Sequence, residues 1–433
     1  MSARRAVFAV VVAGALILAP GGGTVHARVS QSTGASSVGP PHLGRDITIS
    51  NLDNEEYLPS VAYNWKRDEY LVVWHTTWSL GTRDIRAQRV SGQGKLLGDP
   101  FIIYENPTKD SAQPSVAYDP IHDRYLVVWI YDRFGDGSDW NIYGRFVPWN
   151  GPSAAYYDFP ICTWSSSQYS PRVVYNQNPA WSEFLVVWSN ETMGAVPAYI
   201  SGRRVFADAS GFPPGDGFTI ASDPGLTDNY VNADVAYNVA RNEYLVVYSK
   251  DQYDIMATRL QANGNVLGGG IVPIATWPDP EQFPAVAACH TADQYFVAWH
   301  SIQAGPQYSV YGRFVDGDGS VADVLEIART TVYERMPDVA ANPGGRQYLV
   351  VWEQQYTNGS YGIWGRLLSA NKTHGDKFPI VGPGDRWDPA VAAGAPRYLV
   401  AWEHERSGTS FQDIHGRIVT PHAVFLPLVL RQF

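Results

Sequence analysis

One hydrophobic pattern repeats along the chain. A short apolar run that ends in an aromatic residue, as in Tyr70-Leu-Val-Val-Trp74, occurs seven times at intervals of 50 to 60 residues. The residues that end these runs are Trp74, Trp129, Trp188, Tyr248, Trp299, Trp352 and Trp402. Because each run is apolar throughout and does not alternate, the pattern predicts strands that are covered on both faces of a sheet.

Each apolar run has strand-like neighbours. A Pro-x-Val-Ala-like segment precedes it, with Ala233 in place of proline in the fourth copy, and a segment that starts with Ile or Val follows after a variable loop. A weaker fourth segment, such as 101–103 or 378–380, ends the repeat. Four short strands in each of seven repeats predict an all-β fold, a seven-bladed β-propeller with four-stranded blades.

The ends of the repeat array predict how the ring closes. The seventh repeat supplies three strands up to Val419 and lacks a fourth, whereas the unpaired segment Asp46–Ser50 precedes the first repeat. We predict that this N-terminal strand completes the last blade, because closure removes exposed sheet edges. The propeller is therefore expected over residues 45–420.

The flanking segments indicate export. Arg4 and Arg5 precede the apolar stretch 6–19, which is too short for a bilayer span of about 20 residues. We predict a signal peptide over 1–27, a disordered leader over 28–44 and a C-terminal tail over 421–433, with no transmembrane segment. The tail either packs on the propeller or acts as a surface-retention or export tag, and the protein is expected to be secreted or at the cell surface.

Composition and charge indicate the fold class and limit the classes of binding partner. The 15 Trp, 26 Tyr, 40 Gly and 30 Pro are typical of short strands and turns. A formal net charge of −10 argues against nucleic acid or an anionic membrane. Cys162 and Cys289 fall in distant repeats and lack zinc spacing, so two buried free thiols are expected.

Residues 46–419 resemble secreted bacterial propellers built from P-x-V-A-Y…E-Y-L-V-V-W…I-x-G-x-R repeats. The resemblance implies an architecture. It implies no activity, because the function of that group is not assigned.

Three repeated features favour structural roles. An arginine recurs in the third strand of five repeats, at Arg145, Arg203, Arg313, Arg366 and Arg417. The same residue in five blades is expected to do the same structural work in each, such as bonding a carboxylate or loop carbonyls, and not to grip an acidic ligand. The terminal tryptophans are likewise expected to pack between blades. A small residue, Ala or Gly, occupies one third-strand position in every copy, and we expect the neighbouring blade to approach closely there.

Function is expected where the repeats differ, in loops on a rigid scaffold. The loops before the first strand and after the second strand of each blade meet on one face near the central channel. Candidate ligand-binding residues on this face are Tyr57, His75, Trp78, Tyr169, Tyr230, His300, Glu353, Trp387 and Glu403. Aromatic rings stack on sugar faces and carboxylates bond hydroxyls, so this set favours carbohydrate.

Catalytic and metal chemistry have few candidates. Glu353 and Glu403 occupy equivalent positions in adjacent repeats and could form a carboxylate pair for glycoside hydrolysis, with a solvated acidic rim as the favoured alternative. Asp132, Asp136 and Asp139 form an oxygen-rich loop that could bind calcium, although its spacing departs from that of an EF-hand. No cofactor is otherwise expected.

Three functions fit these observations. Recognition of a polysaccharide or a surface protein by a monomer is favoured, because sialidase boxes, nucleophile elbows and metalloprotease motifs are absent from the sequence. The alternatives are an extracellular glycan hydrolase or lyase and a structural cell-surface protein. Because the loops differ strongly between repeats, one central site is expected.

Overall fold

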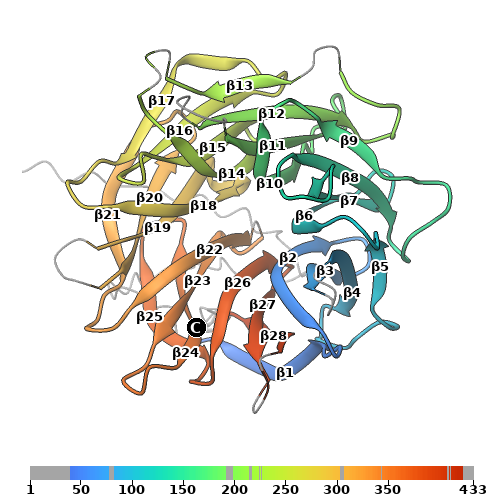
Figure 1. The fold of residues 1–433 in the computed structure, drawn as a ribbon. Coiled ribbons are helices and arrows are strands. Elements are labelled where there is room, and N and C mark those ends of the chain that lie inside the picture. The colour runs from blue at the N-terminus through green and yellow to red at the C-terminus, as the bar shows by residue number, and fades with distance from the viewer. Residues whose placement is uncertain are drawn as a thin grey trace, which may run out of the picture. The chain divides into compact units, whose positions relative to one another are not determined.

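The computed structural model describes residues 40–422, except for 78–81, 192–197, 214–216, 224, 226, 303–306, 343, 407–408 and 410. Within these residues, 28 strands form seven four-stranded antiparallel sheets around a common axis (Figure 1). The one helical element among them is a 3-10 turn, His290–Ala292. The predicted seven-bladed β-propeller is confirmed.

Blades one to six each take four consecutive strands, ordered from the axis outwards. Blades one to three contain β2 (Glu55–Asn64), β3 (Glu69–Thr77), β4 (Arg83–Ser91), β5 (Phe101–Tyr104); β6 (Ser111–Asp119), β7 (Arg124–Asp132), β8 (Trp140–Pro148), β9 (Phe159–Cys162); β10 (Ser167–Tyr175), β11 (Glu183–Glu191), β12 (Tyr199–Phe206) and β13 (Phe218–Ala221). Blades four to six contain β14 (Tyr230–Asn238), β15 (Glu243–Lys250), β16 (Asp254–Gln261), β17 (Val266–Ala275); β18 (Glu281–Cys289), β19 (Gln294–Ser301), β20 (Ser309–Asp316), β21 (Val321–Ala328); β22 (Glu334–Asn342), β23 (Gln347–Gln355), β24 (Tyr361–Ser369) and β25 (His374–Val381).

The seventh blade closes the ring as predicted. It consists of β26 (Arg386–Ala393), β27 (Tyr398–Glu405), β28 (Gln412–Thr420) and the N-terminal strand β1 (His42–Ser50), which pairs antiparallel with β28. β1 begins three residues before the expected start of the propeller at 45. The predicted signal peptide, most of the predicted leader and the tail from 423 onward lie outside the described residues.

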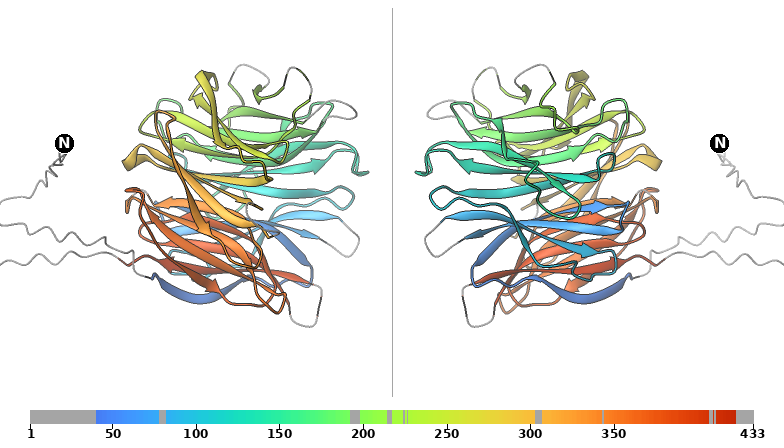
Figure 2. Two further views of the ribbon diagram at one scale, coloured as in Figure 1. Left: turned by 90° about the vertical axis from the view of Figure 1, so that its left-hand side faces the viewer. Right: turned by 90° about the vertical axis from the view of Figure 1, so that its right-hand side faces the viewer.

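The core lies between the blades, whose sheets stack face to face in side view (Figure 2). Each of seven apolar clusters joins two adjacent blades and contains the terminal aromatic residue of a second strand. In one cluster Trp74 of blade one packs with Leu399 and Ala401 of blade seven. All six terminal tryptophans are fully buried, which confirms that they pack between blades.

The repeated arginines also join blades. Arg145 Nη1 donates to the main-chain oxygen of Ile103 at 2.7 Å, and Arg366 Nη1 donates to that of Ile327 at 2.8 Å. The other pairs of this kind are Arg203–Ile161, Arg313–Ile274 and Arg417–Ile380. In every pair the carbonyl belongs to the fourth strand of the preceding blade, so the structural interpretation is confirmed.

The expectation for the small third-strand residue was wrong about which blade approaches it. A Cβ atom at Gly202 would lie 2.9 Å from Cδ1 of Ile220, and one at Gly416 would lie 2.7 Å from Cδ1 of Ile49. Both isoleucines belong to the fourth strand of the same blade. The small residue therefore makes room for its own blade and not for the neighbour.

Both cysteines are buried free thiols, as predicted, with Cys162 in blade two and Cys289 in blade five. Among the described residues no helix has the length and the apolar character needed to cross a membrane.

Candidate functional site

The first strands of the seven blades surround a central channel with a cavity of about 440 Å³. Each of these strands carries a β-bulge at the same position, shown on β2 by a register shift between Tyr57 and Ser60. One bulge residue in every blade has a positive φ of 45 to 56° and lines the channel. These seven residues, here called the bulge ring, are Leu58, Gln113, Ser170, Asn232, Phe283, Met336 and Asp388.

Proline follows the bulge-ring residue in six blades, although a residue before proline is normally extended. A non-glycine residue with positive φ costs on the order of 1–3 kcal/mol, so the surroundings must hold the bulge in place. In blades six, seven and one, a side chain of the preceding blade does this. The Met336 N–H donates to His300 Nδ1 at 3.1 Å, and the Asp388 N–H donates to Glu353 Oε1 at 2.9 Å. The Leu58 N–H donates to Glu403 Oε1 at 2.7 Å.

These three acceptors occupy one position of the repeat, directly after the terminal aromatic residue of the second strand. We call it the bracket position, and its residues are His75, Ile130, Ser189, Ser249, His300, Glu353 and Glu403. Glu353 and Glu403 are only 1% and 4% exposed. The interpretation of these carboxyls as a solvated acidic rim is therefore wrong, because each faces a backbone amide of the next blade.

The two histidines at the bracket position are buried as well. The ring of His75 stacks on that of Tyr57 with centroids 5.5 Å apart. Burial lowers the pKa of both His75 and His300 to about 3, so both rings are neutral at ordinary pH.

A cluster of carboxyls joins blades six, seven and one. Burial, strengthened by the charge of Asp388, raises the pKa of Glu403 well above its usual range, and the two side chains are hydrogen-bonded. Burial also raises the pKa of Glu353, although Arg335 Nε lies 2.9 Å from Glu353 Oε2. Carboxyl groups this close cannot all be ionised at once. Glu403 therefore stays protonated, and its O–H donates a hydrogen bond to the Asp388 carboxylate.

Three of the predicted aromatic residues occupy the same position of the repeat, directly before the bulge-ring residue. Tyr57, Tyr169 and Trp387 are half-buried and lie on the first strands of blades one, three and seven. Tyr230 instead packs edge-on against Tyr248, with centroids 5.6 Å apart, and adds to a core cluster. Trp78 lies outside the described residues.

The acidic loop of blade two is held by turn contacts. Asp132 accepts the N–H groups of Gly135 at 2.9 Å and Gly137 at 2.8 Å, and Asp136 accepts the N–H of Ser138 at 3.0 Å. Asp139 Oδ1 accepts Asn141 Nδ2 at 3.0 Å. Across the part of the chain that the structure describes, no three His, Cys, Asp or Glu side chains gather as a metal site would require. Calcium binding stays a prediction.

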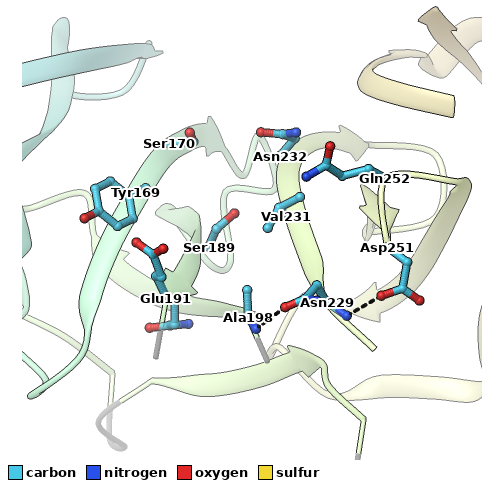
Figure 3. A pocket seen from close by; sticks show the side chains of 11 residues that line it. Tyr169, Ser170, Ser189, Glu191, Ala198, Asn229, Val231, Asn232, Asp251 and Gln252 are labelled. Carbon is cyan, nitrogen blue, oxygen red and sulfur yellow. Dashed lines mark hydrogen bonds between the residues drawn. The ribbon is translucent and has the colours of Figure 1, made fainter. Parts of the chain in front are cut away.

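A pocket of about 520 Å³ lies between blades three and four and shares Ser170 and Asn232 with the channel lining (Figure 3). Tyr169 and Glu191 lie on one side of the pocket, and Gln252 lies across from them. The other lining residues are Ser189, Asn190, Ala198, Asn229, Val231 and Asp251. The channel-side face therefore has a recess that combines an aromatic ring with carboxylate, amide and hydroxyl groups.

The origin of this pocket is the short side chain of Ser189. In blades five to seven a His or Glu at the bracket position crosses to the next blade, whereas the serine hydroxyl of blade three cannot reach as far. Ser189 is only 5% exposed, and its Oγ has no hydrogen-bond partner among the described residues. Blade four also has a serine, Ser249, but there the next bulge-ring residue is the larger Phe283.

The sequence-based candidates include Tyr169 but omit Ser189, Glu191, Asp251 and Gln252, which line the same pocket. The available signal was the small residue at the bracket position. Its meaning depends on the bulge of the next blade, which the repeat pattern does not reveal.

No protein-family model and no curated protein matches this sequence. Among solved structures, the chain is similar to a protein of unknown function from Dyadobacter fermentans DSM 18053, with 14% identity, a TM-score of 0.52 and coverage of 88% of this chain and 99% of that one. It is also similar to the polysaccharide lyase Uly1, with 8% identity, a TM-score of 0.53 and coverage of 87% and 99%. At these identities the likeness shows a shared propeller fold.

Proposed function

We propose that the protein is a secreted or cell-surface recognition propeller that binds carbohydrate in the pocket between blades three and four. The cavity of about 520 Å³ falls within the usual range for small-ligand sites. The ring of Tyr169 can stack on a sugar face, while Glu191 and Gln252 can bond its hydroxyls.

The observation that carries this proposal is the buried hydroxyl of Ser189, which has no hydrogen-bond partner among the residues that the structure describes. A buried polar group without a partner costs about 1–3 kcal/mol. A sugar hydroxyl both donates and accepts hydrogen bonds, so it can pair with Ser189 in either sense.

A longer glycan would continue from the pocket over the channel mouth. Tyr57 and Trp387 occupy the position of Tyr169 in blades one and seven, so they offer further stacking surfaces around the axis. The buried residues His300, Glu353 and Glu403 act in this proposal as positioning residues, because each accepts the N–H of a bulge residue at the mouth. The buried ring of His75 acts in the same sense by stacking on Tyr57.

We expect Ser189→Glu to abolish glycan binding without lowering stability. A glutamate at this bracket position fills the pocket and can reach the Asn232 amide, as Glu353 reaches that of Asp388. Binding of residues 28–433 to immobilised glycans is measured together with the melting temperature. Ser189→Ala keeps the space and removes only the hydroxyl, so it should weaken binding about tenfold.

Two further variants locate the rest of the site. Tyr169→Ala should remove binding of every ligand, whereas Trp387→Ala should weaken only longer oligosaccharides. Wild-type affinity in Ser189→Glu would place the site elsewhere. Failure of the wild-type chain to bind any glycan would contradict the proposal and favour a surface protein as partner or a structural role.

A second function, turnover of a glycan, is favoured by the Glu403–Asp388 pair. A protonated carboxyl beside a carboxylate that lines the channel is a form of general acid–base pair. We expect Asp388→Asn to remove any hydrolysis or elimination by the wild-type chain, measured as new reducing ends or unsaturated products. Product release that persists in this variant would exclude the pair.

A further inference from the structure

We infer that the pocket between blades three and four selects sugars by charge, accepting amino and uncharged sugars and rejecting acidic ones. This inference rests on the proposed function and adds the ligand class. Among the lining residues that the structure describes there are two carboxylates, Glu191 and Asp251, and no Lys, Arg or His.

Two cations that lie close to lining residues in the chain have acidic partners. Lys250, next to Asp251 in the chain, places Nζ 2.8 Å from Asp228 Oδ2. Arg172, two residues after Ser170, places Nε 3.9 Å from Asp234 Oδ1. Each of these two positive charges is therefore offset by an acidic neighbour that does not line the pocket.

The carboxylate of Asp251 is held in place. Its Oδ1 accepts the Asn229 N–H at 2.7 Å, while the Asn229 side chain accepts the Ala198 N–H at 3.0 Å (Figure 3). A fixed negative charge favours an ammonium group and repels a carboxylate before any direct contact forms. Glu191 adds a second negative charge beside Tyr169 on the opposite wall.

The test uses nine sugars on the full chain: the neutral hexose, the 2-amino sugar and the uronic acid of the glucose, galactose and mannose configurations. In each configuration that binds, we expect the amino sugar to bind tightest and the uronic acid at least tenfold more weakly than the neutral sugar. These ratios should shrink as salt is added, because the charged groups are partly exposed to solvent.

Single-charge variants connect the preference to the pocket. Glu191→Gln and Asp251→Asn should each reduce the ratio of amino-sugar to neutral-sugar affinity by about threefold. Asp318→Asn removes one exposed charge from the turn between β20 and β21 in blade five and should leave the ratio unchanged.

The outcomes separate the two proposals. Uronic acids that bind as tightly as neutral sugars, or ratios that both pocket variants leave unchanged, would overturn the charge selection and leave sugar recognition standing. Failure of the chain to bind any of the nine sugars or any immobilised glycan would overturn both.

Discussion

A chain that starts at Leu52, and so lacks β1, is expected to lose the fold of blade seven and to aggregate. β1 supplies the outermost strand of that blade, with Ile47 opposite Gly416 and Leu43 opposite Val419. Without it, β28 presents a row of unpaired backbone groups to solvent, which is a template for pairing between chains.

The loss extends into the core between blades seven and one. Ile49 is 1% exposed in the cluster that contains Trp74 and Leu399, and burial of such a side chain contributes about 1.5–3 kcal/mol. Ser50 Oγ also donates to the buried Glu56 Oε1 at 2.6 Å. We expect the truncated chain either to be insoluble or to melt at least about 10 °C below the control, as measured by calorimetry.

The matched control is a chain that starts at residue 40 and keeps β1. Its melting temperature should equal that of the full chain. A peptide of residues 40–51 added to the truncated chain should restore part of the stability, because an added strand can pair with an open sheet edge. If the chain without β1 melted within about 2 °C of the control, the contribution of this closure to stability would be refuted.

Much of this architecture could be predicted because each repeat has the same pattern of apolar, aromatic and arginine residues. An apolar second strand that ends in Trp requires cover on both faces, and stacked blades provide it. An arginine that recurs in several repeats, such as Arg366, can be assigned a structural role from its recurrence alone. The structure adds the identity of its acceptor, the Ile327 carbonyl. Blade number, strand count and closure all followed from this repetition.

The bulge ring could not be predicted in the same way. The Pro-x-Val-Ala segment indicates an extended strand, yet the residue before proline has a positive φ, as at Met336. That conformation is held by His300 of the preceding blade, which lies 36 residues away in the chain. Local sequence preferences favour an extended residue before proline, so the contact with the preceding blade decides the conformation.

The same dependence on a neighbouring blade explains the errors about burial. Glu353 and Glu403 look like surface residues in a loop, but each is buried and accepts a backbone N–H from the bulge of the next blade. The pocket at Ser189 is the converse case, because a small residue leaves open the space that Glu353 fills in blade six. Neither environment can be read from one repeat alone.

The stability of the propeller is expected to fall as pH rises from 6.5 to 8.5. Burial raises the pKa of Glu281 to about 8 and that of Glu56 to about 7, from a usual value of 4.5, and it also raises that of Glu403. Between the unfolded and folded pKa values the folded chain holds a proton that the unfolded chain has lost. Each such group therefore costs up to about 1.4 kcal/mol of stability per pH unit as pH rises through this window.

The buried histidines act in the opposite direction but outside this range. Their lowered pKa values, about 3 for His75 and His300, mean that the unfolded chain binds more protons below pH 6.5. They therefore reduce stability only as pH falls below 6.5, and the buried carboxyls set the slope above it.

The variant Glu403→Gln measures how much Glu403, in the carboxyl cluster at blades six, seven and one, contributes to this pH dependence of stability. The amide oxygen can still accept the Leu58 N–H, now at 2.7 Å from Glu403 Oε1, and the amide NH₂ can donate to Asp388 as the protonated carboxyl does. Because the amide does not titrate, the melting temperature of this variant should decline less steeply and exceed that of the wild type at pH 8.5. Glu191→Gln, at an exposed carboxylate, should follow the wild-type curve. Parallel curves for Glu403→Gln and the wild type would show that Glu403 ionises in the folded protein as readily as in the unfolded chain, and the proton shared with Asp388 would then have to be abandoned.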